Sequence, residues 1–368
     1  MPVAEIKIPM VDPGRWYRKH LSEVQQLLGE VLSSGRYLLA SRTVAFEQKL
    51  ADFCNTSYAV AVNSGTDALY LSLTVAGIGD GEVIVPSHTA AATISAIEQA
   101  GAIPVFADIQ SRGVCLDPED VERRITERTR AIVAVHMFGV SANMTALREL
   151  ASLHGLLLLE DCAQAFGATH QGVPVGGLGD MGAFSFYPTK NMGAAGDAGA
   201  IVCNDGVTAQ RLVAARQYGW DDERRVCGPG INSRMDEFQA AILNLRLEHW
   251  PQDFARRLHI AERMQNAVAG NPKLSHREAP IGDVHAYHLF VVECAEPELL
   301  SAHLAARGIA SAYHYSRPAH GESHFEQYAT GLELPNTSHL YERMLSIPLF
   351  PELTDTEVAQ IEAALGVW

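Results

Sequence analysis

The stretch "YAVAVNSGTDALYLSLTVAG", residues 58–77, joins an apolar strand to an amphipathic helix. Residues 58–64 read as a buried strand, whereas the apolar residues after Gly65 recur at helical spacing. The same unit repeats downstream, with strands expected at 82–86, 104–109, 131–136 and 156–162 and helices at 89–101, 117–126 and 143–155. Strands alternating with helices of this length predict an α/β fold, in which right-handed crossovers build a mostly parallel sheet with helices on both sides.

The pattern changes after Cys203. A helix is expected at 206–219, followed by a long helical stretch over 233–270 in which Pro251 predicts a kink or a break. A second alternation begins near His285, with strands expected at 288–294 and 310–315 and helices at 297–308 and 354–366. We therefore expect a large domain over residues 1–250 and a smaller C-terminal α/β domain over 251–368, with the segment of about residues 1–25 packed near the latter.

Composition excludes several classes of protein. The chain has 368 residues, 47% hydrophobic and 19% charged, and a net charge of -15, which argues against a nucleic-acid binder and against an anionic membrane surface. No apolar run approaches the roughly 20 residues that span a bilayer, and the first residues lack an apolar signal core, so a cytoplasmic protein is expected. The six cysteines form no Cys-x-x-Cys, and the histidines of 285–290 and 313–320 lack a third ligand at helical spacing, so no metal site is expected.

Polar groups follow three of the predicted strands, and ligands of open α/β sheets bind at the carboxyl ends of strands. In "NSGTDAL" (63–69), the turn of Ser64, Gly65 and Thr66 can cradle a phosphate at the start of a helix, or it can simply cap that helix. In "LLLLEDCAQAFGA" (156–168), Asp161 ends an apolar strand, where it either partners a positive group or caps the next turn.

The third strand end is "FSFYPTKNMGAAGDAGAIV" (184–202), which carries Ser185 and sets Lys190 among small apolar residues. Such surroundings disfavour the charged form of a lysine and suit an amine that attacks as a neutral nucleophile. Pyridoxal phosphate explains all three ends together, because it needs a lysine for its aldehyde, a carboxylate for its pyridine nitrogen and N–H and hydroxyl groups for its phosphate. Lys190, Asp161 and the turn 64–66 supply one group for each need.

The sequence resembles the fold type I pyridoxal-phosphate enzymes and, within them, the DegT/DnrJ/EryC1/StrS family of nucleotide-sugar aminotransferases. The matching stretches run from about residue 30 to residue 355 and include "SGTDAL", "VIVPSHT", "EDCAQAFGA", "FSFYPTKNMGAAGDAGAIV", "GINSRMDEFQAAIL" and "SIPLFPELT". The resemblance implies a large domain with a mostly parallel seven-stranded sheet, a smaller C-terminal α/β domain, and a homodimer with shared active sites.

The resemblance also implies roles for single residues. Lys190 is the implied Schiff-base lysine and proton shuttle, Asp161 the partner of the pyridinium nitrogen, and Gln164 a neighbour of the ring's phenolic oxygen. The phosphate would be held by the residues of two turns and by one residue of a second subunit, namely Ser64, Gly65, Thr66, Ser185 and, from the partner, Asn232.

The chain departs from the family pattern at one position. Where the family usually has an aromatic residue that stacks on the pyridine ring, "PSHTA" has Ala90. His88 is the nearest candidate to replace it, although a histidine in this turn can also cap the helix or touch the substrate. Candidate substrate residues are Tyr187, Arg234, His314 and Tyr315. For Arg234 the alternatives are a role at the subunit interface or a surface salt bridge, and for the aromatic and histidine residues the alternative is core packing.

The implied reaction moves an amino group from L-glutamate to a keto-sugar carried by a nucleoside diphosphate, with pyridoxamine phosphate as the intermediate form of the cofactor. "PSHT" and "RQYG" (216–219) favour a 3-keto-6-deoxyhexose over a 4-keto-sugar, and dTDP is the commonest nucleotide in the family. A keto-cyclitol aminotransferase shares every cofactor residue. A non-catalytic regulator that binds the cofactor is the alternative from another class, whereas Lys190 argues against a dehydratase, because the dehydratases among these relatives carry histidine in its place.

Overall fold

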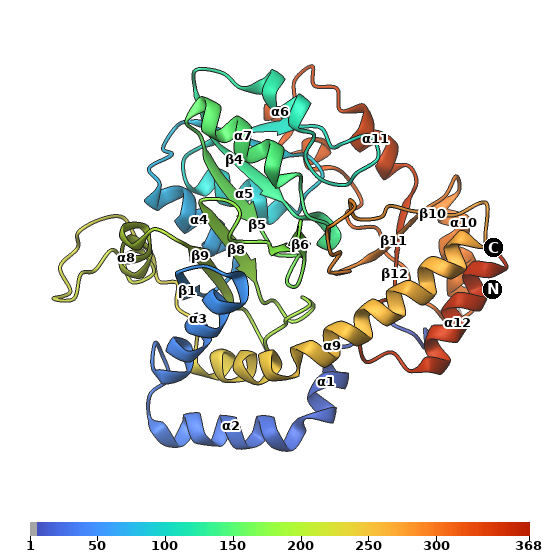
Figure 1. The fold of residues 1–368 in the computed structure, drawn as a ribbon, viewed down its shortest axis with the longest axis horizontal. Coiled ribbons are helices and arrows are strands. Elements are labelled where there is room, and N and C mark those ends of the chain that lie inside the picture. The colour runs from blue at the N-terminus through green and yellow to red at the C-terminus, as the bar shows by residue number, and fades with distance from the viewer. Residues whose placement is uncertain (1–5) are drawn as a thin grey trace.

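The computed structural model describes residues 6–368, and its centre is a seven-stranded sheet (Figure 1). The strand order is β1-β9-β8-β5-β4-β2-β3. The strands are β1 Tyr58–Val62, β2 Glu82–Pro86, β3 Ile103–Ala107, β4 Thr129–Val135, β5 Leu157–Asp161, β8 Met181–Ser185 and β9 Gly199–Cys203. Only β9 is antiparallel to its neighbours, β1 and β8. The predicted mostly parallel seven-stranded sheet is confirmed.

Helices cover both faces of this sheet, because each crossover must bury an apolar face. They are α3 Ser41–Cys54, α4 Gly65–Val75, α5 Ala91–Gln99, α6 Pro118–Arg124, α7 Met144–His154 and α8 Gly206–Ala215. Every residue of β9 is buried, as are all but one of β4 and of β5, so these strands have no solvent face. Short pieces complete the region: the strands β6 Thr169–His170 and β7 Val173–Pro174 and the 3-10 helix η1 Met137–Gly139.

Helix α9, Glu237–Ala269, is one unbroken helix of 33 residues that leads from the large sheet to the C-terminal part of the chain (Figure 1). Of the two alternatives for Pro251, the break is therefore wrong, and the kink stays a prediction. A proline inside a helix removes one backbone hydrogen bond, but neighbouring contacts hold this helix together. Trp250 stacks on Phe254 at 5.0 Å, and α9 packs against α2 (Leu21–Ser34), α3 and α12 (Asp355–Gly366). Neither α9 nor any other helix in 6–368 is long and apolar enough to cross a membrane.

The C-terminal part contains a three-stranded antiparallel sheet of β10 Ser275–His276, β11 Phe290–Glu293 and β12 Met344–Ile347. Its helices are α10 Pro297–Ala305, α11 Pro335–Tyr341 and α12, with 3-10 turns η2 Ala319–Gly321 and η3 Glu326–Tyr328. The strand expected at 310–315 is wrong: only Ala312 forms a bridge, to Ser346. Strand β12 takes that place, because all four of its residues are buried, whereas the residues of 310–315 keep solvent contact.

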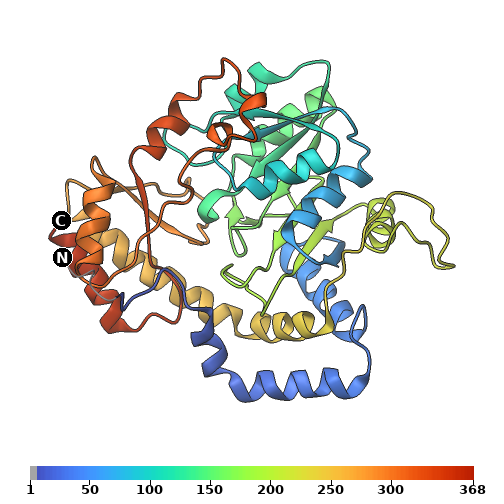
Figure 2. The ribbon, with the colours of Figure 1, turned by 180° about the vertical axis from the view of Figure 1, so that it is seen from behind.

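The first described residues run along the C-terminal part of the chain and lie near its C-terminal end (Figure 2). Ile8 forms a bridge with Ile309 and is buried in the same apolar cluster as β11 and α12. Helix α1, Pro13–Lys19, is tied there by Arg15, which donates to Glu357 at 2.7 and 2.6 Å. Residues 1–5 of the predicted segment lie outside the described residues. The division near residue 250 stays a proposal, since α9 passes through it without interruption.

Candidate active site

The carboxyl ends of β1, β5 and β8 meet at one edge of the sheet, where most of the predicted site residues lie. Because β9 is antiparallel, its first residue, Gly199, reaches this edge too, opposite Val62 and Ser185. The backbones approach closely. A β-carbon on Gly199 would clash with the backbone of Ser64, and one on Gly65 would lie 2.6 Å from the β-carbon of Ser185. Only glycine fits at these two positions.

The turn 64–66 forms the start of α4. Ser64 caps the helix, its hydroxyl accepting from the backbone N–H of Asp67 at 3.0 Å, so the capping interpretation is correct for this side chain. The backbone N–H groups of Gly65 and Thr66 occupy the first helical positions, which have no acceptor within a helix. These two donors, beside the Ser185 hydroxyl, make an anion cradle of the kind found at helix starts.

Asp161 is buried at the end of β5 and uses its two oxygens differently. One accepts from the Thr93 hydroxyl at 2.8 Å, and the other accepts from the backbone N–H of Ala163 at 3.1 Å. The capping alternative therefore holds for one oxygen, since the second contact caps the following turn, and a positive partner for Asp161 stays a prediction. The first contact orients the carboxylate.

Lys190 lies in the turn after β8, where its backbone N–H donates to the carbonyl of Tyr187 at 2.8 Å. Its side chain is partly buried. Burial lowers the pKa of the Lys190 amine from 10.5 to about 8, and the negative charge of Asp161 opposes this shift. A substantial fraction of the amine is consequently neutral near pH 8, as a nucleophile or proton acceptor requires.

His88 is completely buried. Its Nδ1 lies 3.1 Å from the hydroxyl of Tyr341, and its Nε2 has no hydrogen-bond partner. Burial is the main cause that lowers the pKa of His88 to about 3, with a smaller contribution from Arg277, so the ring is neutral at physiological pH. The alternative that His88 caps the next helix is wrong, because α5 has no side-chain cap.

Gln164 connects the large sheet to the C-terminal part of the chain. Its amide oxygen accepts from the backbone N–H of Phe138 at 2.8 Å, and its amide nitrogen donates to the Tyr315 hydroxyl at 3.1 Å. Burial and the charge of Asp161 raise the pKa of Tyr315 to about 12. His314 has its Nδ1 2.9 Å from the Ser346 hydroxyl, and burial and the charge of Lys190 lower its pKa. Three predicted residues, Gln164, His314 and Tyr315, thus lie around Lys190 and Asp161.

Three predicted residues lie farther towards solvent. Tyr187 is 51% exposed, which excludes core packing for its ring in this chain. Asn232 is exposed and forms a backbone bridge with Gln217, in the loop between α8 and α9 that projects from the body of the molecule (Figure 2). Arg234 is partly exposed and forms no ion pair within 4.0 Å among residues 6–368, so the surface salt bridge considered for it is absent from the described chain.

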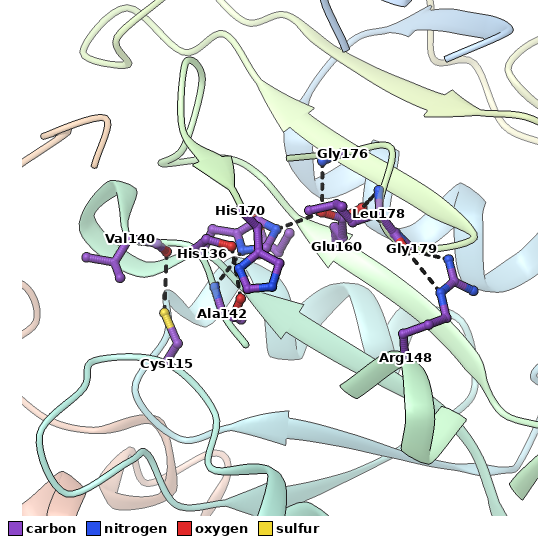
Figure 3. Close-up of polar contacts among 12 residues, drawn as sticks. Cys115, His136, Val140, Ala142, Arg148, Glu160, His170, Gly176, Leu178 and Gly179 are labelled. Atoms are coloured by element: carbon purple, nitrogen blue, oxygen red, sulfur yellow. Dashed lines mark hydrogen bonds and ion pairs between the residues drawn. The ribbon is translucent and has the colours of Figure 1, made fainter. Parts of the chain in front are cut away.

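The carboxylate beside Asp161 has a different role. Glu160 is completely buried and accepts four hydrogen bonds, from His136 Nε2 at 2.9 Å and from the backbone N–H groups of Gly176, Leu178 and Gly179 at 2.6–2.8 Å (Figure 3). His136 Nδ1 accepts in turn from Ala142 N. His136, Glu160 and Cys162 lie close enough together to hold a metal, but both ring nitrogens are already used. The network is explained as a polar core element.

Sequence reasoning missed several residues of the site. Thr93 holds Asp161, Tyr341 contacts His88, and the pKa of His288 is lowered well below its ordinary value by burial and by the charges of Lys190 and Arg257. No sequence motif marked Thr93 or Tyr341, because each contacts a partner that is far away in the chain. His288 stood out only as part of a histidine pair considered for a metal.

Comparison with known proteins agrees with this geometry. The model of the DegT/DnrJ/EryC1/StrS aminotransferase family matches residues 19–366. The chain belongs to this family. It is therefore a fold type I aminotransferase, of a family whose members depend on pyridoxal phosphate.

Similar proteins cover the whole length of this aminotransferase. It is 40% identical over 364 residues to a dTDP-3-amino-3,4,6-trideoxy-alpha-D-glucose transaminase of Streptomyces venezuelae, covering 98% of this chain and 96% of that one. It is 38% identical to a UDP-N-acetyl-3-dehydro-alpha-D-glucosamine 3-aminotransferase of Acidithiobacillus ferrooxidans, covering 97% of each chain. The solved structure of S. venezuelae DesV with a ketimine intermediate superposes with a TM-score of 0.94 at 39% identity, covering 99% of this chain and 98% of that one.

The residues of this aminotransferase fit pyridoxal phosphate. The cradle at Gly65 and Ser185 would be filled by any β-carbon, as expected where backbone must approach a phosphate. The lowered pKa of Lys190 and the oriented carboxylate of Asp161 suit the aldehyde and the ring nitrogen. The unpartnered Nε2 of His88 is a buried polar atom of the kind that a ligand satisfies.

Proposed function

We propose that this aminotransferase moves an amino group from L-glutamate to a nucleotide-linked keto-sugar, with a dTDP-linked 3-keto-6-deoxyhexose as the preferred acceptor. The observation that carries the proposal is the convergence of Lys190, Asp161 and the Gly65–Ser185 cradle at one sheet edge. The amino group leaves L-glutamate as 2-oxoglutarate forms, and it replaces the keto oxygen of the sugar.

The cofactor is proposed to lie with its phosphate on the backbone N–H groups of Gly65 and Thr66 and on Ser185. Ser64 supports this cradle by capping α4, and Asn232 of a second subunit is proposed to complete it. Asp161 would face the ring nitrogen and Gln164 the phenolic oxygen. Pyridoxal phosphate supplies, when bound, an aldehyde that carries the amino group and a ring that withdraws electrons from the reacting carbon.

Lys190 is proposed to move the proton between the donor's α-carbon and the cofactor. Its Nζ can accept this proton because its pKa of about 8 leaves neutral amine near physiological pH. Asp161, oriented by the Thr93 hydroxyl, would hold the protonated ring nitrogen. His88 is proposed to replace the aromatic absent at Ala90, because its ring is flat and uncharged; stacking on the cofactor would require its ring, which protein covers completely in this structure, to become exposed.

The acceptor sugar is proposed to contact the residues that face solvent or the C-terminal part of the chain, namely Tyr187, Arg234, His314 and Tyr315. A free guanidinium such as that of Arg234 suits a diphosphate. The names of the two relatives support a 3-amino product on either dTDP or UDP, so a 4-keto-sugar and a keto-cyclitol are weaker alternatives. We also propose a homodimer and a cytoplasmic location; the projecting loop that bears Asn232 supports the shared site.

The acceptor is identified by adding candidate sugars to the pyridoxamine-phosphate form of the protein. A panel of dTDP- and UDP-linked 3-keto- and 4-keto-sugars and a keto-cyclitol is incubated with it, and the amino product is detected by mass spectrometry. Rapid amination of the dTDP-linked 3-keto-6-deoxyhexose supports the proposal. Faster amination of any other member corrects the acceptor, and indifference to every member favours a regulator that binds the cofactor without turnover.

A further inference from the structure

Arg257 carries an unused edge of its guanidinium group in the interior of the protein. The side chain projects from α9 and is 5% exposed. Its Nη1 donates to the carbonyls of Tyr287 at 2.8 Å and Leu349 at 3.2 Å, which uses both of its protons. The Nε atom is buried with no hydrogen-bond partner, and no described residue accepts a hydrogen bond from Nη2 within 3.5 Å. These two nitrogens form the edge that binds a carboxylate through two parallel hydrogen bonds.

The charge of Arg257 is also not balanced at close range. No carboxylate of residues 6–368 lies within 4.0 Å of its guanidinium nitrogens. Glu352 and Asp253 raise its pKa from a distance, but burial dominates and lowers that pKa to about 10, so the group is still charged at physiological pH. A buried cation without a paired anion is costly, and the open edge is where an anion would relieve that cost.

This side chain lines a partly open cavity of about 120 Å³, whose wall also includes the residue before Lys190. The other polar walls are His288, His314 and Thr189, the residue before Lys190, and the apolar walls include Met10 and Phe350. The charge of Lys190 lowers the pKa of both histidines, which places them near its amine. At ~30 Å³ for each water molecule, the cavity has room for about four, enough for a short aliphatic arm that ends in a carboxylate.

We propose that Arg257 binds a carboxylate group of the amino donor, and of the 2-oxo acid left after transfer, in this cavity. The inference rests on the proposed function, because it takes the donor to be a dicarboxylic amino acid. The Nε and Nη2 atoms of Arg257 hold the carboxylate, the apolar walls contact the methylene groups, and Lys190 is left next to the α-carbon. Helix α9, which spans both parts of the chain (Figure 1), positions the arginine.

The test is calorimetric binding of glutarate to the holoenzyme, because glutarate has the two carboxylates of the donor but neither an amino nor a keto group. We expect wild-type protein to bind glutarate and not its uncharged diamide, glutaramide. Arg257→Gln should weaken glutarate binding about ten- to hundredfold, as for a lost charged hydrogen-bond pair. The matched control is Arg256→Gln, which removes the same charge one residue away, where the guanidinium pairs with Asp355 at 2.7 Å.

A second variant covers the case in which Arg257→Gln does not fold. Val11→Phe adds volume to the cavity wall and should also weaken glutarate binding. Equal binding of glutarate and glutaramide, unchanged affinity in a folded Arg257→Gln, or displacement of glutarate by dTDP would overturn the inference. The proposed function has its own test, which is the change in absorbance when L-glutamate is added. If L-glutamate bleaches the protein but glutarate binds independently of Arg257, the inference alone is refuted. If L-glutamate does not bleach the protein but glutarate binding depends on Arg257, L-glutamate alone is refuted as the donor.

Discussion

Gly65 and Ser185 come from different strand ends and meet so closely that a β-carbon on Gly65 would lie 2.6 Å from that of Ser185. Real β-carbons do not approach at this distance, so the contact exists only because residue 65 is glycine. The approach brings the first N–H groups of α4 next to the Ser185 hydroxyl. The anion cradle therefore depends on a residue that contributes no side chain.

Gly65→Ala is expected to open this cradle and weaken pyridoxal-phosphate binding. Forced overpacking costs roughly 1–3 kcal/mol, which corresponds to about 5- to 150-fold in affinity. The measurement is cofactor titration of the apoprotein followed by absorbance. Gly29→Ala is the control, because a β-carbon there meets nothing within 4 Å. Equal affinities for the two variants would show that the cradle does not hold the phosphate.

Thr93→Val is expected to lower cofactor affinity and slow the half-reaction with L-glutamate, because Asp161 loses the hydroxyl that donates to it at 2.8 Å. A hydrogen bond to a charged group contributes about 1.5–3 kcal/mol. Thr93→Ser keeps the donor and should restore most of the affinity and rate. Stopped-flow absorbance after mixing with L-glutamate measures the rate. If valine and serine behave alike, the hydroxyl does not matter for Asp161.

Adjacent carboxylates should respond in opposite ways to substitution. Glu160→Ala leaves His136 and three backbone N–H groups without their buried acceptor, at a cost of about 3–5 kcal/mol in unfolding free energy. Asp161→Asn should change the melting temperature little but abolish the half-reaction. Thermal unfolding and absorbance of both variants check this pair. A stable Glu160→Ala protein would contradict the structural role of Glu160.

The Lys190 amine gives the apoprotein a specific dependence on pH. Below about pH 8 this lysine is charged in both the folded and the unfolded chain, so burial destabilises the fold fully. Between about 8 and 10.5 the folded chain releases the proton while the unfolded chain keeps it, so stability rises with pH. Lys190→Met should therefore stabilise the apoprotein at pH 7 and lose this advantage by pH 10. An advantage that does not change with pH would mean that the pKa of Lys190 is not lowered.

Much of the sheet and of the candidate site could be predicted because the signals are local. Apolar strands followed by helices indicated the α/β fold, and Asp161 and Lys190 stood out as polar residues in apolar surroundings. The sequence could not decide whether Pro251 would break α9, because the packing of Trp250 and Phe254 that offsets the missing hydrogen bond is seen only in the structure. Strand β12 was missed because Ser346 interrupts its apolar run, whereas β11, equally short, begins with a continuous one.

Contacts between distant residues explain the rest of what the sequence did not reveal. His88 and Tyr341 are 253 positions apart, and Arg257 donates to carbonyls 30 and 92 positions away. No spacing in one sequence reports such pairs. The capping role of Ser64 and the cradle at Gly65 were alternatives in the sequence; the structure shows the cap, and the cradle stays a proposal that is compatible with it.

Absorbance of the purified protein with pyridoxal phosphate tests the central claim most directly. The account predicts a yellow protein whose visible band is bleached towards the pyridoxamine form by L-glutamate, with the loss of this response in Lys190→Ala. A protein that gains no visible band with pyridoxal phosphate, or a Lys190→Ala variant that keeps the wild-type band and full turnover, would contradict it.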